Sequence, residues 1–209
     1  MKLVLCFGDS ITRGAIPVTN ERYDRDIRYP GRLQKLLGED YYVVEEGLNG
    51  RTTMLERKTD PFRNALYYIK PCLGAHQPVD VMVIMLGTND SLLQFDLKPE
   101  EIAAGMHELI RTIKEYTTAH QGFVPNIILA CPPFIGENWR NSPSAADLIG
   151  SREKTIALVD LYKQVADEFG LIYFNTNLYA QTSFEDSVHF DEEGHRIFAE
   201  KMAEIIKEL

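Results

Sequence analysis

Short apolar runs alternate with amphipathic stretches along the 209 residues of this chain. The run 81–86 is apolar without alternation, which is typical of a strand buried on both faces of a parallel sheet. Strands are predicted at residues 3–7, 41–44, 79–86, 127–130 and 171–174.

Helical patterns occupy several of the stretches between these runs. One helix is predicted over 29–37, and another is opened by Pro99 and the two acidic residues after it. A third covers 151–169, where Gly170 supplies a C-terminal stop, and Asp191 is the predicted N-cap of the last helix.

The alternation of strands and helices predicts an α/β fold, because right-handed helical crossovers join consecutive parallel strands. We expect a three-layer α/β/α, flavodoxin-like architecture with a parallel five-stranded sheet in the order 2-1-3-4-5. The sequence contains no repeat, low-complexity segment or linker, so residues 1–209 are predicted to form one domain. Two connections, 12–27 and 132–150, are longer than ordinary loops and are candidates for function or subunit contacts; the second contains Trp139.

Unusual polar residues and glycines follow the predicted strands. Ligands of open parallel sheets bind beyond the carboxyl ends of the strands, so these segments should meet at one edge. Four segments are involved: Gly8-Asp9-Ser10-Ile11-Thr12, Gly47-Leu48-Asn49-Gly50-Arg51-Thr52-Thr53, Gly87-Thr88-Asn89-Asp90 and Asp186-Ser187-Val188-His189. Together they supply a hydroxyl, tight glycine turns, an amide and a carboxylate–imidazole pair, which are the groups that serine acyl transfer needs.

The hydroxyl of Ser10 is the predicted nucleophile. A serine hydroxyl is a poor nucleophile until an adjacent base takes its proton, and the imidazole of His189 is matched to that task at neutral pH. Asp186 lies three residues before His189, a spacing that brings its carboxylate beside the imidazole.

Attack on an ester creates an oxyanion, which needs preorganised hydrogen-bond donors. The backbone N–H groups of Ser10 and Gly50 and the side-chain amide of Asn89 are the predicted donors. Asp9 is predicted to cap the turn or helix that follows it, and Asp90 to brace the turn that aims Asn89.

These segments resemble the sequence blocks of the SGNH hydrolases, the GDSL esterase superfamily. Ser10 matches the serine of block I, Gly50 the glycine of block II, Asn89 the asparagine of block III and His189 the histidine of block V, with Asp186 as the acid. The order and spacing of the blocks extend over nearly the whole chain. The resemblance implies the SGNH hydrolase fold and a serine esterase without a cofactor or a metal.

Within the superfamily, residues 5–10, 45–53 and 84–90 resemble most the bacterial arylesterase/acyltransferase branch. That resemblance implies a small-molecule ester with a short, acetyl-like acyl group as substrate, a homo-oligomer, and acyl transfer to alcohols as a further activity. One departure is Gly50, where the acyltransferase of this branch has alanine. A backbone N–H can serve from either residue, so the departure bears on acyl transfer and not on the oxyanion hole.

Composition and charge exclude several partners. The chain is 44% hydrophobic and carries a formal net charge of −9, so neither nucleic acid nor an anionic membrane is expected to bind it. Cys6, Cys72 and Cys131 form no CxxC pair and are expected to be buried reduced thiols. No apolar run is long enough for a signal-peptide core or a membrane span, and the protein is predicted to be cytoplasmic.

Alternatives remain open from the residues alone. His195, inside the last helix, is a rival base, whereas His76, His107 and His120 are expected to have surface roles. A nucleotide-binding module could use residues 8–14 as a phosphate loop, although GxGxxG and GK[ST] are absent. A metal-dependent phosphoesterase could take its ligands from Asp9, Asn89, Asp90, Asp186 and His189, although no HxxxH or HExxH pair occurs.

Overall fold

The computed structural model describes residues 1–19, 21–55 and 60–209. Across these residues, five parallel strands form one sheet in the order β2-β1-β3-β4-β5, which confirms the predicted topology. The strands are β1 (Lys2–Gly8), β2 (Tyr41–Gly47), β3 (Val81–Met85), β4 (Asn126–Cys131) and β5 (Ile172–Asn175).

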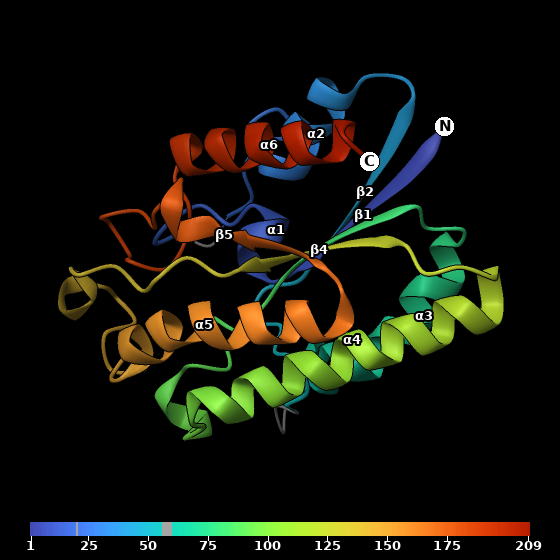
Figure 1. The fold of residues 1–209 in the computed structure, drawn as a ribbon. Coiled ribbons are helices and arrows are strands. Elements are labelled where there is room, and N and C mark those ends of the chain that lie inside the picture. Colours follow the sequence, from blue (N-terminus) through green and yellow to red (C-terminus); the bar gives the residue numbers. More distant parts are fainter. Residues whose placement is uncertain (20, 56–59) are drawn as a thin grey trace.

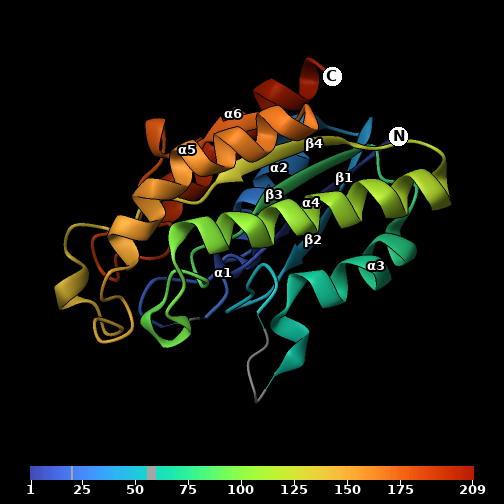
Figure 2. The same ribbon diagram turned by 60° about the horizontal axis from the view of Figure 1, so that its bottom comes forward.

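Helices cover both faces of the sheet, so the predicted three-layer α/β/α architecture is confirmed. Figure 1 shows α2 (Tyr29–Leu37) and α6 (Glu192–Lys207) side by side on one face. The opposite face is covered by α3 (Ala65–His76), α4 (Pro99–Gln121) and α5 (Ser151–Phe169), and Figure 2 shows α3 and α4 running across it. Within the described ranges, none of the helices combines the length and apolarity that a membrane crossing requires.

The alternation of side chains along the strands divides the core in two. In β1, Leu5 and Phe7 pack with the apolar residues of α3, α4 and α5, whereas Val4 and Cys6 pack with those of α2 and α6. Every residue of β3 is buried, as its unbroken apolar run predicts.

Local sequence determines where the helices begin and end, and three predicted boundaries are confirmed. Pro99 is the first residue of α4, where a missing N–H leaves no helical hydrogen bond unmade. Gly170 ends α5 with a left-handed φ of 67°. Asp191 caps α6 by accepting a hydrogen bond from the N–H of Gly194 at 2.8 Å.

The helix α3 was not predicted. It contains Pro71 in its interior, and a proline there cannot donate to the carbonyl four residues earlier, so the sequence pattern does not indicate a helix. Its start does carry a signal, because the Asn64 side chain accepts a hydrogen bond from the N–H of Tyr67 and caps the first turn.

A short helix, α1 (Ser10–Arg13), begins directly after β1 and lies on the carboxyl end of β2. The close approach needs a glycine in β2. A Cβ on Gly47 would lie 2.1 Å from the backbone N of Arg13 and 2.5 Å from the carbonyl carbon of Thr12. Gly47 thus allows α1 to sit where the first two strands end.

The three cysteines are free and buried, as predicted. Burial raises the pKa of the Cys72 and Cys131 thiols to about 12, so neither carries appreciable thiolate at neutral pH.

Candidate active site

A cavity of about 440 Å³ lies at the carboxyl ends of the strands. Residues from all four segments that the sequence singled out line it, so the fold brings together the ends of β1, β2 and β3 and the turn before α6. The lining residues from these segments are Ser10, Asn49, Gly50, Thr88, Asn89, Asp186, Val188 and His189.

Ser10 is the first residue of α1. The carboxylate of Asp9 accepts a hydrogen bond from the N–H of Ile11 at 3.0 Å and so caps this helix. At the first position of a helix the backbone N–H has no intrahelical acceptor, so the N–H of Ser10 is available to an anion in the cavity.

His189 connects Ser10 to Asp186. Its Nε2 lies 2.9 Å from the Oγ of Ser10, and its Nδ1 lies 2.6 Å from Oδ2 of Asp186. Ser10 and His189 are 179 positions apart in sequence, so the parallel sheet, and not local spacing, creates this contact. The chain of hydroxyl, imidazole and carboxylate is continuous, as nucleophilic activation of a serine requires.

Backbone N–H groups hold Asp186 in place. Its Oδ1 accepts hydrogen bonds from the N–H groups of Val188 and His189, both at 2.9 Å, and its Oδ2 accepts one from Val18 at 3.3 Å. Burial opposes ionisation of Asp186, but the hydrogen bond and charge of His189 and the backbone donors outweigh it, so its pKa lies below the usual value. Asp186 is therefore an anion that fixes the orientation of His189.

Val18 is a contributor that the sequence did not reveal. Its φ is 68°, a left-handed conformation that is costly for a β-branched residue. This strained backbone directs its N–H to Asp186, and Val18 also lines the cavity. The only sequence signal was the length of the 12–27 connection.

The three predicted oxyanion donors lie around the same cavity. Gly50 has a φ of 71°, which glycine adopts without strain and alanine does not. The side-chain nitrogen of Asn89 donates to the carbonyl of Arg51 at 3.0 Å and has a longer contact, 3.4 Å, with Oδ2 of Asp9. These contacts hold the Asn89 amide at the edge of the cavity beside Ser10.

The two aspartates that follow the first and third strands are buried under the site. Burial raises the pKa of Asp9 to about 6, although the N–H of Ile11 and the nearby His189 partly offset this. Asp90 accepts hydrogen bonds from the N–H of Thr53 at 2.9 Å and from its hydroxyl at 2.6 Å. Asp90 thus ties the turn of Asn89 to the loop after β2.

The remaining histidines lie away from Ser10. His195 is buried in α6 and accepts a hydrogen bond from the N–H of Tyr29, and burial lowers its pKa to about 3, so it is not placed to act on Ser10. His76 and His107 pair with Glu46 and Glu168, partners that local spacing could not show. The ring of His120 stacks on that of Tyr116.

The metal-ligating side chains of the described residues gather elsewhere. Glu46, Cys72 and His76 offer ligand atoms within 4.8 Å of one another, but none of them lines the cavity around Ser10. Among the described residues, the His, Cys, Asp and Glu side chains form no such group of three around Ser10.

The second long connection also contributes residues that the motifs did not indicate. Its 143–148 part forms one wall of the cavity, whereas Trp139 lies outside the cavity lining and contacts Arg140. The complete set of lining residues beyond the four segments is Val18, Arg63, Leu92, Pro143, Ser144, Asp147 and Leu148.

Known proteins share this sequence pattern and this fold. The sequence model of the GDSL-like lipase/acylhydrolase family matches residues 6–197. The chain belongs to this family. The family prediction made from the four sequence blocks is therefore confirmed.

Relatives of this GDSL-family chain act on several kinds of ester. An acetylxylan esterase of Xylanibacter ruminicola is 30% identical over 220 residues, which cover 97% of this chain and 42% of that protein. The chain thus spans less than half the length of this curated relative. Among solved structures, the aryl esterase of M. smegmatis superposes with a TM-score of 0.93 at 33% identity over the whole of both chains. Est24, a carbohydrate acetylesterase from Sinorhizobium meliloti, superposes with a TM-score of 0.92 at 31% identity over 100% of this chain and 99% of that one.

Proposed function

We propose that this chain hydrolyses short-chain acyl esters through an acyl-enzyme formed on Ser10. The observation that carries the proposal is the continuous hydrogen-bonded chain from Ser10 Oγ through His189 to Asp186, with distances of 2.9 and 2.6 Å. Ser10, at one end of this hydrogen-bonded series, lines a cavity of about 440 Å³, a size suited to a small ester.

The first half of the reaction breaks the ester. Ser10 Oγ attacks the carbonyl carbon while its proton passes to Nε2 of His189, and the ionised Asp186 stabilises the imidazolium. The resulting oxyanion accepts hydrogen bonds from the N–H groups of Ser10 and Gly50 and from the amide of Asn89. His189 then gives the proton to the leaving alcohol, and the acyl group stays on Ser10.

The second half releases the acid. Water gives a proton to His189 and attacks the acyl-enzyme, and the proton returns to Oγ as the carboxylic acid leaves. An alcohol that replaces water in this step receives the acyl group, which is acyl transfer. Both outcomes use the same groups, so the shape and polarity of the site decide between them.

The relatives favour an acetyl group as the acyl part and a carbohydrate or aryl alcohol as the leaving group. That the protein is one domain and a cytoplasmic homo-oligomer, without nucleic-acid or membrane partners, stays a prediction from the sequence.

The test is Ser10→Ala, with p-nitrophenyl acetate as substrate and EDTA present. We expect kcat to fall by at least about 10⁴-fold, because the variant lacks the oxygen on which the proposed acyl intermediate forms. Thr118→Ala, on the exposed face of α4, is the control for loss of a hydroxyl. Retained ester hydrolysis in Ser10→Ala contradicts the proposal, and so does metal-dependent cleavage of p-nitrophenyl phosphate with no esterase activity.

A further inference from the structure

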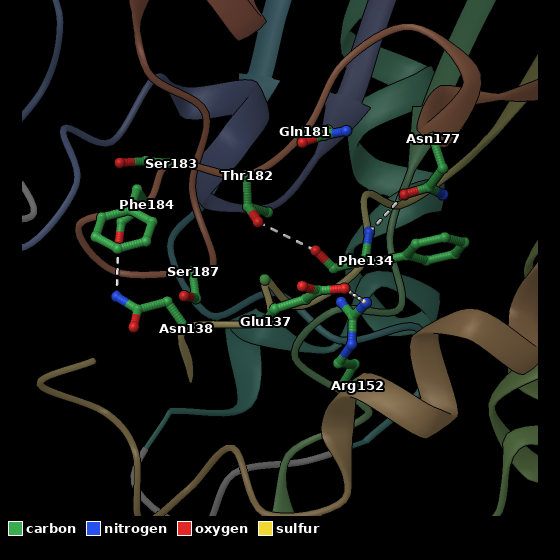
Figure 3. A pocket seen from close by; sticks show the side chains of 11 residues that line it. Phe134, Glu137, Asn138, Arg152, Asn177, Gln181, Thr182, Ser183, Phe184 and Ser187 are labelled. Carbon is green, nitrogen blue, oxygen red and sulfur yellow. Dashed lines mark hydrogen bonds and ion pairs between the residues drawn. The ribbon is translucent and has the colours of Figure 1, made fainter. Parts of the chain in front are cut away.

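A second cavity, of about 410 Å³, lies against the segment that carries Asp186 and His189 (Figure 3). Ser187 lines this second cavity, whereas its neighbours Asp186 and Val188 line the cavity around Ser10. The segment 183–189 is therefore a wall common to both. Consecutive Cα atoms are about 3.8 Å apart, so the two cavities approach each other closely on either side of this segment.

Aromatic faces and fixed polar groups together line the second cavity. The ring of Phe184 lies at the rim of this cavity. The residue is 80% exposed, because nothing in the described structure covers it. Figure 3 shows Asn138 donating to the carbonyl of Phe184 at 3.1 Å and Thr182 donating to the carbonyl of Phe134 at 3.2 Å. These bonds preorganise the polar side chains, as in small-ligand sites, whose volumes are about 300–1,000 Å³.

The charges in this cavity favour a neutral ligand. Arg152 donates to Glu137 at 3.1 Å and to the carbonyl of Ile135, so its positive charge already has a carboxylate partner. An anion would have to displace Glu137, and a long acyl chain would have to cover the amides of Asn138 and Gln181 without pairing them.

Ser187 gives an independent sign of a ligand. Its Oγ is buried and has no hydrogen-bond partner among the described residues, and its φ of 63° is a left-handed conformation. Gly136 packs closely opposite it, and a side chain at this position would crowd both hydroxyls, since a Cβ there would lie 3.0 Å from Oγ of Ser187 and 3.1 Å from Oγ1 of Thr182. A buried hydroxyl without a partner costs stability, and a ligand hydroxyl would remove that cost.

We propose that the second cavity binds a sugar residue of an O-acetylated oligosaccharide whose acetyl ester reaches Ser10. A pyranose ring has an apolar face of C–H groups, which packs on an aromatic ring such as Phe184, and an edge of neutral hydroxyls, which pair with amides and with Ser187. The proposal rests on the proposed ester hydrolysis and adds to it the part of the substrate that lies beyond the scissile bond.

The experiment compares substrates that differ in their sugar part. They are p-nitrophenyl acetate, which has no sugar, acetylated methyl xyloside, which has one, and acetylated xylotetraose, which has four. In Phe184→Ala, we expect the ratio of kcat/KM for the oligosaccharide to kcat/KM for p-nitrophenyl acetate to fall about tenfold. The ratio of kcat/KM for acetylated methyl xyloside to kcat/KM for p-nitrophenyl acetate should equal that of the wild type, because a single sugar residue cannot occupy both cavities.

Phe123→Ala is the matched control. Phe123 is also an exposed phenylalanine, at 43%, but it precedes β4 and so lies at the opposite end of the sheet. Its ratios should equal those of the wild type. An unchanged oligosaccharide ratio in Phe184→Ala overturns the inference while ester hydrolysis through Ser10 stands, whereas Ser10→Ala that still hydrolyses p-nitrophenyl acetate overturns the proposed function instead.

A second variant tests binding without turnover. Ser187→Ala removes the buried hydroxyl without adding volume, so its thermal midpoint should be no lower than that of the wild type. Titration with unacetylated xylotetraose, followed by calorimetry, should show an affinity at least about threefold weaker than for the wild type. The inference is overturned if both Ser187→Ala and Phe184→Ala bind xylotetraose as tightly as the wild type does, or if the wild type does not bind it.

Discussion

Replacing Asp186 by asparagine should change the proton on His189 while leaving the fold in place. Two backbone N–H groups, at 2.9 Å each, hold Oδ1, so the asparagine carbonyl takes that position. The amide NH₂ then replaces Oδ2, where it faces Nδ1 of His189 at 2.6 Å and the N–H of Val18 at 3.3 Å. A donor at this point forces Nδ1 to accept, which moves the imidazole proton to Nε2, where it blocks proton transfer from Ser10.

We expect Asp186→Asn to lower kcat for p-nitrophenyl acetate by about 10³–10⁴-fold, the size seen when a triad imidazole takes the wrong tautomer. This corresponds to about 4–5.5 kcal/mol of lost transition-state stabilisation. Initial rates at pH 8 measure the effect, with circular dichroism and the thermal midpoint as checks on folding.

Asp191→Asn is the matched control for this substitution. Asp191 lies five residues further along and caps α6, and asparagine is an equally good N-cap, so its kcat should stay within about twofold of the wild type. A folded Asp186→Asn protein with kcat within about tenfold of the wild type would refute the reasoning that Asp186 orients His189.

Two other predictions concern stability. Because burial raises the pKa of Asp9 in the folded state to about 6, above its usual 3.8, the stability that the wild type has at pH 4 is partly lost as pH rises to about 6. Asp9→Asn should therefore raise the free energy of unfolding in urea by about 1–3 kcal/mol at pH 8 and by much less at pH 4, and an equal change at both pH values would contradict this. Gly47→Ala should destabilise the fold by at least about 2 kcal/mol, because the new Cβ meets the backbone of α1. Gly38 has open space around it but a left-handed φ, so Gly38→Ala should lower the free energy of unfolding by only about 1 kcal/mol. Equal losses of stability in the two variants would exclude the steric explanation.

The sequence predicts the sheet and most of its covering helices because the apolar runs of β1, β3 and β4 are almost wholly buried. The run of β3 has no polar residue, and the apolar residues of α4 recur at helical spacing. Both patterns therefore indicate which side chains are buried. The helix α3 was missed because Pro71 is a local signal against a helix, whereas the burial of Ile69 and Leu73 in the core offsets the lost hydrogen bond.

The candidate site could be located from the sequence to the extent that it consists of side chains at strand ends. Ser10, Asn89 and His189 follow strands or precede a helix, where a parallel sheet collects its ligand groups. The N–H of Val18 on Asp186 could not be predicted, because every residue except proline carries that donor and only the loop conformation aims it. The second cavity could not be predicted either, since its lining residues, such as Arg152 and Gln181, belong to none of the motifs at the strand ends.

The segment 183–189 belongs to two cavities at once, and this has a thermodynamic consequence. It is a closed turn, in which the N–H of Ser187 donates to the carbonyl of Ser183 and the N–H of Ser183 donates to the carbonyl of His189. A molecule that shifts this turn from one side shifts it for the other, and linkage makes such an effect mutual. If a ligand beside Ser187 changes the affinity for an ester at Ser10 by some factor, the ester changes the affinity for that ligand by the same factor. The free energies of filling the two cavities then do not simply add.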